Sequence, residues 1–266
     1  MWKSICVPAI TFGNSVMVHN SKFWAKVDRI QRDVGRYAVG CQFRCAKEFV
    51  EGEIGMSTMA EREVQSKLIY AQRIKKLEND RWVNMLQSVK REMEAKTKWY
   101  RRVDFAARKL GLNKKEWEKE NIGAAEIKKK VRATFDKEWI DGMKNKKSLK
   151  LYRESNRDRK LRRTIYENSQ GSGLLADARA GMLQVCSLEK KYIEGMEDKC
   201  RACCKVEETL KHVVLDCKSL GHDRGTVTLQ EALGFTGDIN KEVNITQVRL
   251  SRWKKICVEG KFKHMY

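Results

Sequence analysis

Apolar residues recur at helical spacing through most of this chain, and this pattern constrains the fold more than any other feature. Between residues 20 and 40 the apolar side chains repeat every three or four positions, at Phe23, Trp24, Val27, Ile30, Val34 and Tyr37. This spacing places them on one face of an α-helix. The chain has a single proline, Pro8, so few positions interrupt helices. We therefore predict a mainly α fold rather than a sandwich or a barrel.

Two further amphipathic helices follow the first. Asn20 or Ser21 can cap the first helix, and Thr58 with Glu61 has the spacing of a capping box for the second. The apolar stripe of the second helix comprises Met59, Val64, Leu68, Ile69 and Ile74. A third helix is predicted from about Asp80, with Trp82, Leu86, Val89 and Met93. We predict a helical bundle over residues 1–97. Its apolar N-terminal segment, 1–18, is interrupted by Pro8 and Gly13 and is expected to be core rather than a membrane span or a signal peptide.

The middle of the chain carries most of the positive charge. Residues 88–165 contain 26 Lys and Arg against 12 Asp and Glu, a surplus of 14 out of a net charge of +21. Helical spacing continues there, so residues 98–167 are predicted to form helices with basic outer faces. Concentrated positive charge repels itself unless a polyanion offsets it, which indicates RNA or DNA as a partner.

Three basic clusters are the predicted nucleic-acid contacts: Lys98, Arg101 and Arg102; Lys128, Lys129 and Lys130; and Arg157, Arg159, Lys160, Arg162 and Arg163. On helices these side chains can contact backbone phosphates. The cluster 157–163 also fits a nuclear import signal. Trp99 or Tyr100 could stack on an unpaired base, but their helical spacing favours a place in the core.

A cysteine–histidine cluster follows the predicted linker, residues 168–173, in a C-terminal module over 174–266. Cys200, Cys203, His212 and Cys217 have the spacing C-x2-C-x8-H-x4-C. A C-x2-C turn aims two sulfurs at one point, and the short helix after it can return His212 and Cys217, giving the four ligands that Zn²⁺ prefers. Cys204 is an alternative to Cys203 as the second ligand. Since four protein ligands leave no place for a water, we predict one structural zinc ion rather than a catalytic one.

The cysteine content bears on the compartment. The chain has nine cysteines, four of them within residues 200–217, which differs from a secreted disulfide framework. We therefore expect a reducing compartment, the nucleus or the cytoplasm. The sequence shows no Ser/His/Asp arrangement and no phosphate-cradling glycine loop, so we expect neither an enzyme nor a small-molecule substrate, and no membrane partner.

Four stretches together resemble the C-terminal region of reverse transcriptases from non-LTR (LINE-type) retrotransposons. They are "WKSICVPAITFGNSVMV", "FWAKVDRIQRDVGRYAVG", "EGEIGMSTMAEREVQSKLIYAQRI", and "LLADARAGMLQV" followed by "CRACCKVEETLKHVVLDC" and "HDR". They occur in the family's order and cover about two-fifths of the chain. The marks of the terminal module fall on Arg179, Gly181, Cys200, Cys203, Glu208, Thr209, His212, Cys217 and Arg224.

The resemblance implies a thumb region followed by a CCHC zinc-knuckle module that binds nucleic acid, with Arg179 among the contacts. The parent family is an RNA-directed DNA polymerase, whose palm carries paired aspartates for two metal ions. This chain has no Asp-Asp pair, and its only proline, Pro8, is not followed by the aspartate of the endonuclease motif that some relatives carry. We therefore expect a binding fragment of such an element, with other parts of the retroelement protein as further partners.

Two other interpretations remain open from the sequence. The chain could be a zinc-stabilised protein-interaction module whose charge serves solubility or import. It could also be a non-functional remnant of a transposable element.

Overall fold

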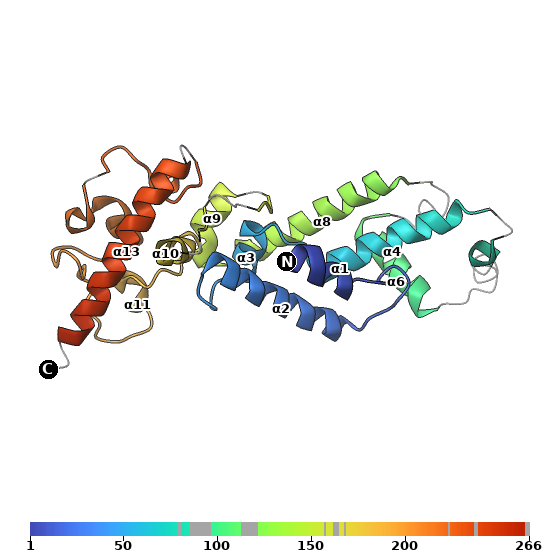
Figure 1. Cartoon of the computed structure of the whole chain (residues 1–266), viewed down its shortest axis with the longest axis horizontal. Helices are drawn as coiled ribbons and strands as arrows, with labels where there is room; N and C mark the ends of the chain where they lie inside the picture. Colours follow the sequence, from blue (N-terminus) through green and yellow to red (C-terminus); the bar gives the residue numbers. More distant parts are fainter. Residues whose placement is uncertain are drawn as a thin grey trace. The chain divides into compact units, whose positions relative to one another are not determined.

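The computed structural model describes residues 1–78, 81–85, 97–112, 122–156, 158–161, 165–167, 169–222, 224–236 and 239–263. Within these residues the protein is mainly helical, which confirms the predicted fold class, and one isolated antiparallel bridge joins Lys199 and Glu207 (Figure 1). The chain forms two compact units: Met1–Gln31 with Ser57–Trp139, and Arg32–Met56 with Ile140–Tyr266. This division differs from the predicted boundaries near residues 97 and 168, because two long helices each contribute to both units.

The first unit contains short helices η1 (Trp2–Cys6) and α1 (Val7–Ile10), most of α2 (Ser21–Val39), α4 (Met59–Lys75), α6 (Lys98–Lys109) and most of α8 (Ala124–Lys144). Helix α4 packs against α6. The core they enclose consists of aliphatic and aromatic residues spaced three or four apart on each helix: Val64, Leu68, Ala71, Val103, Ala106, Ala107, Ile127, Val131 and Phe135. The predicted third helix of the bundle falls largely on residues 79–80 and 86–96, which lie outside the described residues.

Helix starts follow the predicted caps. The Asn20 side chain accepts a hydrogen bond from the Lys22 backbone N–H at 2.9 Å, and the Thr58 hydroxyl accepts one from the Glu61 N–H at 3.1 Å. Thr97 does the same for Tyr100 at the start of α6. Each side chain satisfies a backbone donor that has no partner within its helix.

The buried stripe of α2 differs from the predicted one. Phe23, Ile30 and Tyr37 are exposed by 42%, 53% and 86%, whereas Gln31 is buried and donates from its amide to the Ser57 carbonyl. The buried positions Trp24, Val27, Gln31, Gly35 and Val39 have the same period on an adjacent helix face. Hydrophobicity therefore predicted the helix and the burial of Trp24 and Val27 correctly, but not the C-terminal part of its buried face.

The N-terminal segment is also less buried than predicted. Val7 joins Trp24, Val27 and Met59 in a small core cluster, but Phe12 is 82% exposed and Val16 and Met17 are about half exposed. Only part of residues 1–18 therefore belongs to the core.

The second unit contains α3 (Lys47–Glu53), η2 (Lys147–Leu149), α9 (Lys150–Ser155), α10 (Gln170–Arg179), α11 (Cys186–Glu189), η3 (His212–Asp216), η4 (Lys218–Leu220), α12 (Leu229–Ala232) and α13 (Ile239–Lys263). It also includes the ends of α2 and α8. Helix α13 packs along α10 and contacts α12, η3 and η4. None of the described helices combines the length and apolar character that a membrane span requires.

The predicted linker at residues 168–173 is wrong for its last four residues. Gln170 to Gly173 form the first turn of α10, and Ser169 and Ser172 make a reciprocal capping box. A Cβ atom on Gly173 would lie 2.7 Å from the Gly40 carbonyl oxygen. The glycine-rich composition therefore serves close packing of helix against backbone rather than flexibility.

Candidate metal centre

A tight hairpin positions the first two cysteines of the cluster. The Cys200 N–H donates to the Val206 carbonyl at 2.7 Å, and the Glu208 N–H donates to the Asp198 carbonyl at 2.7 Å. Between these strand-like ends, the Cys204 N–H donates back to the Cys200 carbonyl, and Cys204 has a φ of +56°. This left-handed residue completes the turn that directs Cys200 and Cys203 to one point.

A short helix supplies the other two residues. The Thr209 hydroxyl accepts from the His212 N–H at 3.1 Å and caps this helix, as the sequence predicted a helix here. His212 begins η3, and Cys217 follows its last residue. Val213, Val214 and Leu215 are buried, so the packing of η3 fixes the direction of the two ligands at its ends.

The four predicted ligand side chains converge. The ligand atoms of Cys200, Cys203, His212 and Cys217 all lie within 4.8 Å of one another, and this group could hold a metal ion. Cys200 and Cys217 place their Sγ atoms 3.9 Å apart, and the Cys203 Sγ lies 3.4 Å from His212 Nε2. Cys204 is exposed and is not a member of the group, so the structure favours Cys203 as the second ligand.

Backbone amides surround the sulfurs. The Ala202 N–H points at the Cys200 Sγ at 3.4 Å. Burial raises the pKa of the Cys200 thiol to about 12, against the opposing effect of the Cys203 and Ala202 N–H groups. For Cys203 burial also raises the pKa, but the Lys205 N–H and the His212 ring outweigh it and lower the pKa to about 6. These N–H groups stabilise a thiolate, which is the form that binds a metal.

A buried carboxylate anchors the hairpin to the rest of the unit. Glu208 is fully buried and accepts hydrogen bonds from the Cys186 N–H at 3.1 Å and the Trp253 indole N–H at 3.1 Å. It also pairs with the Arg201 guanidinium at 2.6 Å, and Arg201 lies over the Trp253 ring at 5.3 Å from its centroid. Arg201, which follows Cys200, is therefore held through Glu208 by both α11 and α13.

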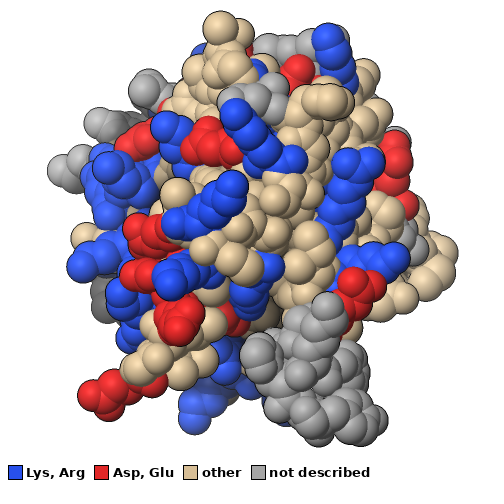
Figure 2. Space-filling model, turned by 90° about the vertical axis from the view of Figure 1, so that its left-hand side faces the viewer, with Lys and Arg blue, Asp and Glu red and all other residues tan. Residues whose placement is uncertain are grey.

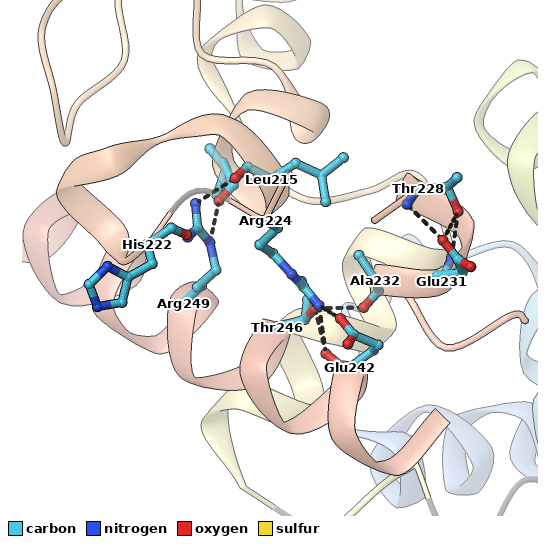
Figure 3. Close-up of polar contacts among 10 residues, drawn as sticks. Leu215, His222, Arg224, Thr228, Glu231, Ala232, Glu242, Thr246 and Arg249 are labelled. Atoms are coloured by element: carbon cyan, nitrogen blue, oxygen red, sulfur yellow. Dashed lines mark hydrogen bonds and ion pairs between the residues drawn. The ribbon is translucent and has the colours of Figure 1, made fainter. Parts of the chain in front are cut away.

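Helix α13 holds the second half of the site through Arg249. This buried guanidinium donates to the carbonyls of Leu215 at 3.2 Å and His222 at 2.9 Å (Figure 3). It also donates to the Cys217 carbonyl at 2.9 Å. The carbonyls at the end of η3 have no partner within that short helix, so Arg249 caps it. The sequence analysis missed Arg249, because nothing in the local charge pattern separates it from its exposed neighbour Arg252.

A second arginine braces the turn after the site. Arg224 donates to the Thr246 hydroxyl at 2.6 Å and pairs with Glu242, both on α13 (Figure 3). Thr246 in turn donates to the Ala232 carbonyl at 2.5 Å at the end of α12. These contacts hold the segment after Cys217 against α13.

The basic residues predicted as nucleic-acid contacts divide by exposure. Five are exposed: Lys98, Arg101, Lys128, Lys129 and Lys160. Arg102 is half-buried and donates to the His19 carbonyl at 3.2 Å, and the half-buried Lys130 lies 3.7 Å from Glu126. Arg157, Arg162 and Arg163 lie outside the described residues.

Two predicted contacts are inside the protein instead. Arg179 is 0% exposed, pairs with Glu53 at 3.0 Å and lies over the Phe235 ring at 4.1 Å. Burial lowers its pKa, but the Glu53 carboxylate outweighs that effect and raises it. Arg159 is 3% exposed and donates to the Met56 carbonyl. Neither buried side chain is accessible to a phosphate.

Trp99, considered as a stacking residue, belongs to the interior. Its indole N–H donates to the Ser15 carbonyl at 2.7 Å, and its ring packs edge-on against Tyr70. Phe105, on the same helix as Trp99, is 51% exposed.

Lys and Arg side chains are spread over the face drawn in Figure 2, with Asp and Glu among them.

No family model, curated protein or solved structure matches this chain.

Proposed function

We propose that this protein binds single-stranded or structured nucleic acid and that one structural Zn²⁺ ion holds its C-terminal module. The convergence of four Cys and His ligand atoms within 4.8 Å is the observation that carries the metal part of the proposal. The net charge of +21 and the exposed lysines and arginines of α6 and α8 support the nucleic-acid part.

The ligand set fits zinc in both chemistry and spacing. Tetrahedral Zn²⁺ with Zn–S bonds of about 2.3 Å places two sulfurs about 3.8 Å apart, and a sulfur and an imidazole nitrogen about 3.5 Å apart. The corresponding distances here are 3.9 Å and 3.4 Å. Three thiolates and one imidazole are the donors of structural zinc sites, and with four protein ligands the ion orders the fold rather than activating water.

We further infer that the chain corresponds to the thumb and zinc-knuckle region of a LINE-type reverse transcriptase. The residues that carry this resemblance have defined tasks: Glu208 anchors the hairpin, Thr209 caps η3 and Arg224 braces the following turn. Gly181 has a φ of +64° and packs against the Ser148 carbonyl, where a Cβ would lie 2.2 Å from its oxygen. The genomic sequence upstream of the Met1 codon tests this inference, since it should encode an Asp-Asp-bearing palm in the same frame.

The binding experiment combines metal content with a salt series. We expect one zinc per chain in the purified protein, lost in Cys217→Ser. RNA affinity should fall with a slope of about 0.7 in log K per phosphate contact on single strands as log salt rises. Lys128→Gln with Lys129→Gln should reduce that slope, and the control pair Lys22→Gln with Lys26→Gln, which removes the same charge from exposed positions of α2, should reduce it less. An equal reduction of the slope in both pairs would mean that RNA is held by general electrostatic attraction rather than by α8. Weak RNA binding that does not depend on salt would contradict the proposal.

One observation favours a second candidate, a protein-interaction module. Within the first unit Phe12, Phe23 and Ile30 expose large apolar surfaces to solvent. Exposed apolar groups of this size often mark a partner interface. Zinc binding combined with weak, salt-insensitive RNA binding would favour this candidate.

A further inference from the structure

A cavity in the first unit lies between four helices and is independent of the metal centre. Its volume is about 240 Å³, and its lining comes from α2, α4, α6 and α8. This is slightly smaller than the about 300–1,000 Å³ of pockets for drug-sized ligands, so it suits a smaller group.

The walls of the cavity combine aromatic rings with charged groups. Trp24, Phe105 and Phe135 supply rings, while Arg102 and Lys109 on α6 supply cations. Lys109 lies over the Phe135 ring with its Nζ 4.1 Å from the centroid. Phe105 is 51% exposed although it borders the cavity, so its ring is accessible to a ligand.

Two buried polar groups lining the cavity lack hydrogen-bond partners among the described residues. Glu63, 7% exposed, has an Oε1 atom that accepts no hydrogen bond there, with Lys67 and Arg102 at ion-pair distances of 3.5 Å and 3.8 Å. The indole N–H of Trp24, which is 3% exposed, has no acceptor within the described part of the chain. Buried polar atoms are normally satisfied, so such groups indicate a missing partner.

The charges restrict the kind of ligand. A negatively charged ligand group directed into the cavity would be repelled by the Glu63 carboxylate. An N–H group in the same place would donate a hydrogen bond to that carboxylate. Negative charge is favoured outside, where Arg101 is exposed on α6 one turn before Phe105 and Arg102 lines the cavity. The ligand that fits this cavity is therefore a flat aromatic group. It carries a hydrogen-bond donor at its inner edge and a negative charge at its outer edge.

We propose that this cavity binds one unpaired nucleobase carrying an exocyclic amine, with its phosphate held by the basic residues of α6. The base stacks against Phe105 and donates its amine hydrogen to Glu63, the contact by which carboxylates recognise cytosine in DNA grooves. This proposal rests on the proposed nucleic-acid function and assigns that function a base-binding site. The same nucleotide chemistry could come from a strand or from a free mononucleotide, and the experiment separates the two.

The test uses the full chain and fluorescent 12-nucleotide RNAs of cytidine or uridine, because uracil has no exocyclic amine. Wild-type protein should bind the cytidine strand about tenfold more tightly than the uridine strand. Phe105→Ala should weaken cytidine-strand binding about tenfold, the usual scale of losing one base–aromatic stack. Phe43→Ala removes a phenylalanine of the second unit that is even more exposed than Phe105, and it should leave affinity unchanged. Glu63→Gln should reduce the preference for cytidine, provided that its thermal unfolding shows an intact fold.

Each result decides the proposal. Unchanged affinity in Phe105→Ala, with no preference between strands and a steep salt dependence, would overturn the base site and leave nucleic-acid binding standing. If wild-type protein binds neither strand, the proposed function fails. Calorimetry with cytidine monophosphate then shows whether the cavity binds a nucleotide. Binding of that nucleotide, lost in Phe105→Ala, would support a site for free nucleotides, and its absence would overturn the site.

Discussion

At the scale of single residues, Glu208 links three parts of the second unit. Its carboxylate receives hydrogen bonds from the backbone of α11, the guanidinium of Arg201 in the knuckle hairpin and the indole of Trp253 on α13. Each of these donors is buried or half-buried. A neutral side chain at position 208 would leave the Arg201 cation without its main counter-charge.

We therefore predict that Glu208→Gln destabilises the protein by about 3 kcal/mol, the usual cost of breaking a buried ion pair on one side. Urea unfolding monitored by tryptophan fluorescence measures this change. Glu207→Gln, at the exposed neighbouring position, is the matched control and should change stability by less than about 0.5 kcal/mol. Equal stability of the two variants would contradict the anchoring role.

The same residue predicts a pH dependence. Burial raises the pKa of Glu208, but the hydrogen bonds from Arg201 and Trp253 outweigh it and hold the pKa below its ordinary value of 4.5. A lowered pKa means that the stabilisation is fully present above the ordinary value and is lost as pH falls through the folded value. The difference in unfolding free energy between wild type and Glu208→Gln should therefore be constant near neutral pH and shrink below about pH 4.5. A difference that grows on acidification would contradict this assignment.

Adjacent cysteines provide a direct test of ligand identity. Cys203→Ser removes a member of the four-residue group, whereas Cys204→Ser changes an exposed thiol on the next residue. We expect Cys203→Ser to lower zinc affinity by at least about 100-fold and Cys204→Ser to retain wild-type affinity, measured by competition with a chromogenic chelator. The opposite order would make Cys204 the ligand.

At the scale of elements, α13 acts as the support of the metal centre. Arg249 is buried and caps the end of η3, while Arg252, three residues later, is exposed and donates to the Leu220 carbonyl at 3.3 Å. Arg249→Met keeps much of the side-chain volume but leaves several carbonyls without a donor.

We predict that Arg249→Met lowers the unfolding free energy by about 2–4 kcal/mol, because hydrogen bonds from a charged donor contribute about 1.5–3 kcal/mol each and part of the loss is recovered by water. Arg252→Met should cost less than about 1 kcal/mol. Thermal unfolding of both zinc-loaded variants compares them directly. A larger effect of Arg252→Met would mean that η4, rather than η3, depends on α13.

The helices show which information is local. The capping residues Asn20 and Thr58 and the helical character of residues 98–109 and 124–144 were predictable, because caps and helical periods depend on residues a few positions apart. The buried face of α2 was not, since Gln31 is buried by a hydrogen bond to Ser57 and Gly35 by close packing against Ile54. Both partners lie about twenty or more residues away along the chain.

The convergence of the candidate metal ligands was predictable for the same reason. Cys200 to Cys217 form one short hairpin and helix, so their spacing nearly determines their geometry. Arg179 was misassigned, because only the fold brings Glu53 and Phe235 to it. The exposure of Phe105 likewise depends on four helices meeting around a cavity, which no local pattern encodes.

At the scale of the whole molecule, the segment that carries the candidate metal centre differs from the first unit in its regular structure. The first unit has continuous apolar clusters built from its own helices. In the second, residues 186–222 contain one four-residue α-helix, one five-residue π-helix and one three-residue 3-10 helix. Segments of this kind have little core of their own, and metal binding of about 10–16 kcal/mol can supply the missing folding free energy.

Chelation should therefore loosen the second unit locally and leave the first unit intact. We predict that removing zinc with a strong chelator increases backbone hydrogen exchange in residues 198–222 by at least about 100-fold, since loss of even 3 kcal/mol of local stability changes exchange by that factor. Amides of Leu68, Val103 and Val131 should exchange as before, because their core cluster contains no residue from the metal centre. Peptide-resolved mass spectrometry measures both regions in one experiment, and restoring zinc should restore protection. Faster exchange throughout the chain would mean that the two units unfold as one, while unchanged exchange at 198–222 would mean that α13 and Glu208 hold the knuckle without the ion.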